Sequence, residues 1–252
     1  MIALLSPAKS LDFERPFPAV TATAPRFADD AEALAAAAAR LGAKRLATLM
    51  RISDRLATLN AGRFAGFADA ARRPAIHAFN GHVYAGFEAA SLDEPAIVFA
   101  QNHVRILSGL YGLLRPLDTI RPYRLEMGTR WAPGAARDLY GYWGRRISDL
   151  LAADLADEGS GVIVNLASRE YWRAVETCPP ESARIITVDF REQGPDGPRF
   201  NSFGAKTARG LMARWICEHR IEDPAHLSDF DSDGYRFAGR DADGALLRFI
   251  RG

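Results

Sequence analysis

Short apolar runs that end abruptly in polar residues constrain the fold of this chain more than any other feature. Ile2 to Leu5 is followed by Ser6-Pro7, residues 161–166 (GVIVNL) lead into Ala-Ser-Arg, and residues 184–190 (RIITVDF) form a third run. Apolar runs of this length between turn signals are typical of buried β-strands. Helical patterns separate them, and this alternation predicts an α/β or mixed α+β fold, with a central mixed sheet flanked by helices.

Apolar residues at helical spacing lie between and after these runs and predict helices over residues 28–41, 94–104, 136–157 and 204–219. Ala75 to Phe79 is predicted to be a further strand, because the turn signal Asn80-Gly81 follows it. The stretch YRFAGRDADGALLRFI near the C-terminus predicts a hairpin. No Pro/Ser/Gly-rich linker and no internal repeat divides the chain, so we expect one compact domain over residues 1–252.

The composition is that of an ordinary globular protein, with 48% hydrophobic and 25% charged residues. No run approaches the roughly 20 apolar residues of a membrane span, and the start is too short for a secretory signal. Two cysteines without CxxC or HxxxH spacing predict reduced thiols and no Cys/His metal site. We therefore expect a cytoplasmic protein with no membrane association, no metal and no cofactor.

The positive charge is concentrated in three segments, although the net charge is only +1. Residues 40–73 hold eight basic and two acidic residues (+6), residues 101–146 hold eight and three (+5), and residues 206–220 hold four and one (+3). If the fold brings these segments together, they form a basic cleft that attracts anions. If it does not, they are three separate solvated helix faces.

The densest arginine segment is SGLYGLLRPLDTIRPYRLEMGTR, residues 108–130. The Arg-Pro-Leu-Asp turn predicts that Asp118 fixes Arg115. The YRLE stretch alternates as a strand does, so Arg124 and Glu126 are expected on one face. This pair is either a structural ion pair or a site in which Glu126 holds Arg124 for an anionic ligand, and the spacing does not choose.

Polar residues follow two of the predicted strands. Ser6 and Lys9 come after the first, and Asn165, Ser168 and Glu170 come at or after the end of GVIVNL. In open α/β sheets, ligands bind beyond the carboxyl ends of the strands. An asparagine at a buried strand end needs a hydrogen bond, so Asn165 either pins a neighbouring loop or faces a ligand.

A fourth stretch, AKTARGLMARW, places Lys206 and Arg209 one helical turn apart on the same side of a predicted helix. Two like charges at this spacing are mildly unfavourable unless an anion or a carboxylate lies opposite them. The five histidines are scattered, and no nucleophile triad or carboxylate pair is evident. The residues therefore suggest anion binding more directly than any reaction.

The stretches LLSPAK, LMRISDRLATLN, LSGLYGLLRPLDTIRPYRLEMG, LYGYW, VIVNLASREY and AKTARG occur in the order in which they occur in the YaaA family of bacterial peroxide-stress proteins. The chain resembles that family over nearly its full length. The resemblance implies a cytosolic protein that helps cells survive hydrogen peroxide, in part by limiting free iron. It also implies a compact α/β fold with a basic cleft, and DNA binding through a helix-hairpin-helix element.

Residues 43–64 are the segment that resembles this element. Its apolar frame is close to the pattern L-x-x-L-P-G-I-G-x-x-x-A-x-x-I, but Arg51 and Ser53 replace the two hairpin glycines. The substitution weakens the case for close backbone approach to DNA, and side-chain phosphate contacts from Arg51 and Ser53 could replace it. The other interpretation is an ordinary helical hairpin that packs on the core.

Two functional hypotheses follow. The first is a DNA-binding protein whose anion-contacting residues are Arg51, Ser53, Arg55, Arg115, Arg121, Arg124, Lys206 and Arg209. The second is an enzyme that acts on a nucleotide, a nucleobase or another small anionic substrate, with pocket residues Ser6, Lys9, Glu126, Asn165, Ser168 and Glu170. The sequence names no catalytic residue and no reaction.

Overall fold

A mixed sheet of eight strands crosses the molecule, which is described by a computed structural model covering residues 1–252. In spatial order the strands are β11 (Tyr235–Arg240), β12 (Leu246–Arg251), β9 (Arg184–Gly194), β8 (Val162–Asn165), β1 (Ile2–Leu5), β5 (Val104–Ser108) and β6 (Gly112–Leu114), and β10 (Gly197–Arg199) pairs with β9. The five strands from β12 to β5 are parallel, and β11, β10 and β6 are antiparallel to their neighbours. The predicted fold class is confirmed.

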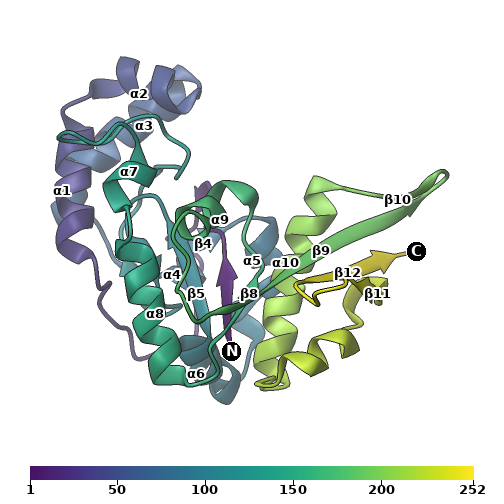
Figure 1. Ribbon diagram of the computed structural model, residues 1–252. Coiled ribbons are helices and arrows are strands. Elements are labelled where there is room, and N and C mark those ends of the chain that lie inside the picture. The colour runs from purple at the N-terminus through teal and green to yellow at the C-terminus, as the bar shows by residue number, and fades with distance from the viewer.

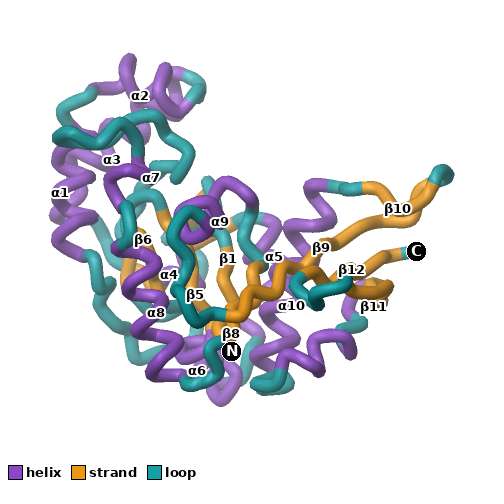
Figure 2. The backbone as a smooth tube through the Cα atoms, in the orientation of Figure 1, coloured by secondary structure: helices purple, strands orange, loops and turns teal.

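The chain has ten α-helices. They are α1 (Ala28–Ala39), α2 (Gly42–Met50), α3 (Asp54–Ala65), α4 (Ala75–Ala78), α5 (His82–Phe87), α6 (Glu94–His103), α7 (Leu139–Trp143), α8 (Arg146–Glu158), α9 (Arg169–Glu176) and α10 (Ser202–Glu218). Most of them flank the sheet, while α2 and α3 lie at one end of the molecule (Figures 1 and 2). Short two-stranded pairs join β2 (Ser10–Leu11) to β4 (Phe79–Asn80) and β3 (Arg73–Pro74) to β7 (Thr119–Ile120). Four 3₁₀ turns complete the chain: η1 (Phe67–Asp69), η2 (Ala89–Ser91), η3 (Pro224–Asp229) and η4 (Ser232–Gly234). No helix has both the length and the apolar character that a bilayer crossing requires.

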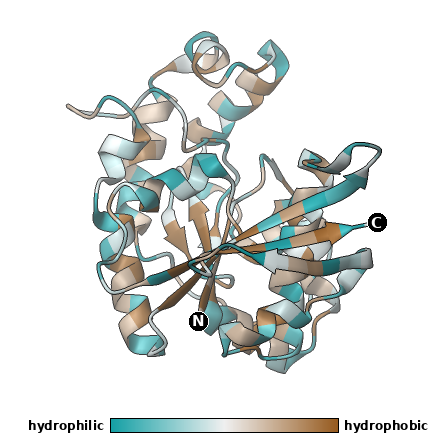
Figure 3. Cartoon of the chain, turned by 45° about the vertical axis from the view of Figure 1, so that its right-hand side comes forward, coloured by the Kyte–Doolittle hydropathy of each residue, from teal (hydrophilic) through white to brown (hydrophobic).

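Strand β1 lies at the centre of the core. Its four residues are fully buried, and it pairs in parallel with β8 on one side and β5 on the other. A strand that is covered on both faces has apolar residues at consecutive positions, and this explains the sequences IALL and VIVN. In Figure 3 the strands in the middle of the sheet are brown, the colour of hydrophobic residues, and polar residues lie further out.

The segment 43–64 folds as two helices joined by a tight turn, as predicted. α2 ends at Arg51, whose φ of 52° places it in the left-handed region, and α3 begins after Ser53, whose hydroxyl accepts a hydrogen bond from Leu56 N–H. Left-handed residues at helix ends are usually glycine or asparagine. Arg51 therefore adopts the conformation that the hairpin glycine would have supplied.

Three predicted elements differ in the structure. Residues 75–78 form the short helix α4 rather than a strand, because a short apolar run is compatible with either state and periodicity alone does not separate them. The helix predicted over 136–157 is two helices, since Gly144 interrupts it with a φ of 50°. The YRLE stretch has no ladder partner; the hydroxyl of Tyr123 instead lies 2.7 Å from that of Ser108 at the end of β5.

Helix α10 packs against α5 with backbone-to-backbone contact. A Cβ atom added at Gly210 would overlap the carbonyl oxygen of Val83, and one added at Gly86 would overlap that of Thr207. The two glycines therefore permit a separation that no larger residue allows. This contact places the first turns of α10 beside the start of α5.

We expect Gly210→Ala to lower the free energy of unfolding by about 2 kcal/mol or more, because overpacking a close helix contact forces the backbones apart. Urea denaturation measures the change. The matched control is Gly62→Ala, since Gly62 also lies within a helix but has open space around it. That variant should gain stability by roughly 0.5–1 kcal/mol from helix propensity. Equal effects of the two substitutions would contradict the close contact.

His77 is a buried side chain that the fold keeps uncharged. Its ring stacks on Phe17 with centroids 5.0 Å apart, and its buried Nε2 has no hydrogen-bond partner. Burial lowers the pKa of His77 to about 4, with a smaller contribution from the nearby positive charge of Arg73. The folded state therefore binds a proton at His77 less readily than the unfolded chain does.

This difference predicts a pH effect on stability. The contribution of neutral His77 is fully present above the ordinary histidine pKa of about 6.5 and is lost as the pH falls toward 4. At pH 4.5 protonation should favour the unfolded chain by about 2 kcal/mol relative to pH 7. In His77→Gln this part of the acid destabilisation should vanish, as measured by urea unfolding at both pH values. An unchanged pH dependence in the variant would contradict the assignment.

Candidate anion-binding pocket and helical hairpin

A pocket of about 510 Å³ lies beyond the carboxyl ends of β1 and β8. Its walls come from the loop after β1, the starts of α5 and α9, and the first turns of α10. The charged lining consists of Lys9, Arg169, Glu170, Lys206 and Arg209. Four cations face one carboxylate, so the pocket has a net positive charge and suits an anionic ligand. Of the residues predicted at the two strand ends, Ser6, Lys9, Ser168 and Glu170 line this pocket.

Hydrogen bonds hold the two strand-end loops together. Ser6 Oγ accepts from Ser168 N–H at 2.8 Å, and the two hydroxyl oxygens are 3.3 Å apart. The hydroxyl of Tyr84 donates to the carbonyl oxygen of Ser6 at 3.0 Å. Polar atoms at a buried strand end need such partners. Ser6 and Ser168 therefore fix the floor of the pocket.

Lys9, Arg124 and Glu126 form one ion-pair cluster. Glu126 Oε1 accepts from Arg124 Nη2 at 2.8 Å and lies 3.3 Å from Lys9 Nζ. The expected proximity of Arg124 and Glu126 is thus observed. Arg124 and Glu126 do not line the pocket themselves; they reach it only through Lys9. One carboxylate shared by two cations leaves the cluster with a single positive charge.

Asn165 and Glu170 each have a local structural partner. Asn165 is buried, and its Oδ1 accepts a hydrogen bond from Ala167 N–H at 3.0 Å. It therefore pins the loop that leads to Ser168 and does not line the pocket. Glu170 lines the pocket, and its Oε1 accepts from Gly128 N–H at 2.9 Å. This bond ties the arginine-rich segment to the start of α9.

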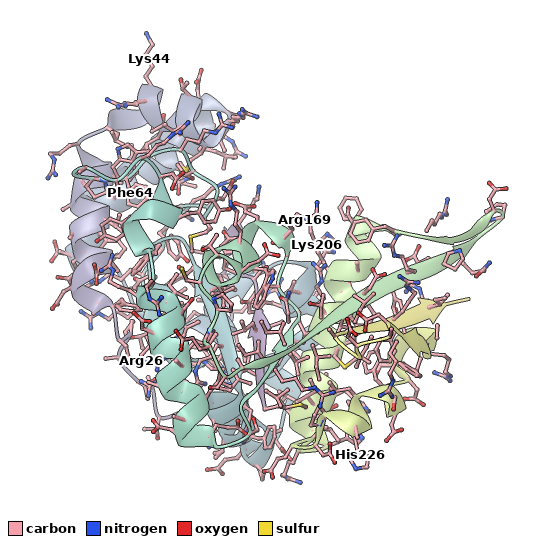
Figure 4. All side chains as sticks on the ribbon, in the orientation of Figure 1. Arg26, Lys44, Phe64, Arg169, Lys206 and His226 are labelled. Carbon is pink, nitrogen blue, oxygen red and sulfur yellow. The ribbon has the colours of Figure 1, made fainter.

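Arg209 differs from the other cations of the pocket because part of its guanidinium is buried. Its Nε is buried without a hydrogen-bond partner. Burial lowers the pKa of this guanidinium, and the charge of Asp189 offsets the effect in part. Of the four cations in the lining, only Lys9 has an ion-pair partner. Arg169, Lys206 and Arg209 therefore present positive charge that the chain itself does not neutralise (Figure 4 labels the first two).

Arg115 and Arg121 lie outside the pocket and bind carboxylates of the chain itself. Arg115 donates to the fully buried Asp118 at 3.0 Å, as the Arg-Pro-Leu-Asp turn predicted. Arg121 Nη1 lies 3.0 Å from Glu32, and its guanidinium sits over the ring of Phe67. We therefore leave these two arginines out of the candidate site, and their predicted contacts to an external anion stay a prediction.

The hairpin between α2 and α3 forms a second cationic surface. Arg51, Ser53 and Arg55 are exposed, and neither arginine makes an ion pair within the chain. Lys44 projects from α2 at the far end of this region, at the top of Figure 4. The hairpin cations are therefore free to contact an external partner. They do not belong to the pocket lining, so the chain has two separate cationic features.

Three residues at the pocket were missing from the candidates that the sequence suggested. Arg169 directly follows Ser168, so its position after a strand was a usable signal. His82 lines the pocket from the start of α5, and Phe203 packs edge-on against it, with ring centroids 5.2 Å apart. A phenylalanine carries no sign in the sequence that it is exposed. No group of three or more His, Cys, Asp or Glu side chains is placed to hold a metal ion.

The mixed sheet and the cationic pocket at its strand ends define an α/β protein with the features of an anion binder. The family model described as "Peroxide stress protein YaaA" matches residues 1–241. A UPF0246 protein of Rhizorhabdus wittichii is 66% identical over 251 residues, which cover 100% of this chain and 99% of the relative. UPF0246 proteins of Laribacter hongkongensis and Alteromonas mediterranea are 47% and 46% identical, again over 100% of this chain and 99% and 98% of the relatives. The chain belongs to the YaaA family of peroxide stress proteins, as its motifs predicted.

Proposed function

We propose that this peroxide stress protein acts in the cytosol by binding DNA. The observation that carries the proposal is the exposed helical hairpin, in which Arg51 takes a left-handed conformation and neither Arg51 nor Arg55 has an ion-pair partner. Guanidinium groups bind phosphate oxygens with two parallel hydrogen bonds. The hairpin therefore offers DNA backbone contacts of the helix-hairpin-helix kind, made by side chains where glycine backbone would otherwise make them.

Such binding is independent of base sequence, because phosphate contacts position a protein on DNA without reading it. A protein that covers DNA in this way shields it from oxidants. The limiting of free iron that the family resemblance implies would then be an indirect effect of this protection. Arg51, Ser53 and Arg55 are the residues proposed to contact DNA. Arg115 and Arg121 are not among them, because each forms an ion pair within the chain.

The double substitution Arg51→Ala/Arg55→Ala should weaken duplex binding by about tenfold or more at low salt. It should also reduce the slope of log K against log salt concentration by about two, because each lost phosphate contact removes close to one unit. Fluorescence anisotropy with a labelled 20-base-pair duplex over a salt series measures both. The charge-matched control is Arg184→Ala/Arg240→Ala, which removes two exposed arginines from β9 and β11, outside the hairpin. Identical slopes for the two double variants would exclude the hairpin.

A second candidate function is an enzyme or binding protein for a small anionic ligand, and the pocket itself favours it. A protein that only grips a DNA backbone has little need of a walled pocket whose floor is fixed by Ser6 and Ser168. The pocket volume falls within the range typical of small-molecule sites. Ser6, Lys9, Ser168 and Lys206 all line the pocket, which supports this hypothesis, whereas Glu126 and Asn165 lie outside its lining. No side chain is assigned a catalytic role.

Lys206→Ala should reduce the affinity for inorganic pyrophosphate by about tenfold, because it removes an unpaired cation from the pocket. Isothermal titration calorimetry at low salt measures the change. Lys44→Ala serves as the control, since it removes an equally exposed lysine from the hairpin region and should leave pyrophosphate binding unchanged. Loss of binding in both variants would indicate general charge attraction in place of a pocket.

A further inference from the structure

Two exposed phenylalanines flank the start of α10. Phe200 is 53% exposed and Phe203 is 62% exposed, which makes Phe203 the most exposed large apolar side chain of the molecule. The chain has 14 phenylalanines, and burial of their rings is a main source of its stability. An exposed ring contributes little of that stability, so Phe203 is not explained by folding.

Local helix chemistry does not require the ring either. Asn201 caps α10 by accepting hydrogen bonds from Phe203 N–H and Gly204 N–H. Any residue with a backbone N–H at position 203 would satisfy this cap. The aromatic character of Phe203 is therefore free to serve a ligand.

The ring of Phe203 stands beside the pocket. Lys206, one turn further along α10, places its ammonium 5.9 Å from the ring centroid. His82 packs its ring edge-on against Phe203, at 73°. Lys206 and His82 both line the pocket, and Arg209 follows Lys206 by a further three residues. An exposed aromatic face and two cations without ion-pair partners thus occur together on one helix.

We propose that the pocket binds a nucleotide, with its unpaired nucleobase stacked on Phe203 and its phosphate held by Lys206 and Arg209. The inference rests on the anion pocket described as the second candidate function, and it names the ligand class. Every nucleobase has a π-face, and stacking on an aromatic side chain next to a basic groove is the common way to bind unpaired bases. A paired base in a duplex is already stacked on its neighbours and offers no free face.

Two sources can supply this chemistry, namely a free nucleotide and a nucleotide within a single strand. Both present one base with two open faces and at least one phosphate. The carboxylate of Glu170 also lines the pocket and opposes a densely charged ligand. A base that contributes to binding through Phe203 offsets this repulsion without adding negative charge.

The test compares binding of four probes to the full chain: 5′-AMP, an eight-nucleotide thymidine strand, the same strand with abasic sites, and inorganic pyrophosphate. Phe203→Ala should weaken binding of AMP and of the intact strand by about tenfold and leave the abasic strand and pyrophosphate unchanged. Phe203→Tyr should retain wild-type binding, because it preserves the aromatic face. Lys206→Ala should weaken all four. Circular dichroism and thermal unfolding confirm that the variants fold, and the exposure of position 203 makes this the expected result.

These measurements distinguish base stacking on Phe203 from anion binding by the pocket. If Lys206→Ala weakens pyrophosphate binding but Phe203→Ala changes nothing, the pocket binds anions and the stacking assignment fails. If Phe203→Ala weakens the intact and abasic strands equally, the ring does not act on the base and the inference is again overturned. If pyrophosphate binding survives Lys206→Ala, the anion pocket itself is wrong. Binding of AMP alone, or of the strand alone, supports the inference and identifies the source.

Discussion

The parallel pairing of β1 with β8 is the interaction on which the rest of the structure depends. Both strands are buried, and both end at the same edge of the sheet, so the chain leaves each of them as a polar loop at one place. The bond from Ser168 N–H to Ser6 Oγ then joins the two loops. Because this floor is fixed, the helices that rise from it determine what the pocket contains. The glycine contacts between α5 and α10 complete the arrangement by holding Lys206 close to His82.

The arginines of this chain divide into two groups by their partners. Arg115 and Arg121 bind carboxylates of the chain, and each is held by Asp118 or Glu32. A cation so paired has lost most of its attraction for a further anion. Arg209 belongs to the other group, because it makes no ion pair with a carboxylate of the chain and its buried Nε has no hydrogen-bond partner. Charge that remains unneutralised at a partly buried position is costly unless a ligand supplies the counter-charge. The distribution of partners, more than the number of arginines, therefore locates the candidate anion-binding features.

The alternation of apolar runs with helical patterns was enough to predict the central sheet, because burial on both faces leaves a direct mark on a strand. The same pattern suggested that Ser6 and Ser168 lie close together, since neighbouring parallel strands end at the same edge of a sheet. The same rules failed for residues 75–78, where a run too short to show a period is helical. They could not pair Arg121 with Glu32 across 89 residues, since that contact exists only in the folded chain. Phe203 was missed because composition does not reveal that an apolar side chain is exposed.

Two cationic features in one chain imply a division of roles. The hairpin is exposed and has no walls, so it suits a long ligand that is bound along its backbone. The pocket is walled, holds one carboxylate among four cations, and has an aromatic ring beside it, so it suits a single residue of such a ligand or a free small molecule. If the proposed DNA binding is correct, a protein of the peroxide response would have a use for both features, because unpaired bases occur in damaged DNA. On the proposals above, the hairpin would hold a strand by its phosphates and the pocket would accept only an unpaired base. On this reasoning the stacked base would distinguish damaged DNA from intact duplex, which phosphate contacts alone do not.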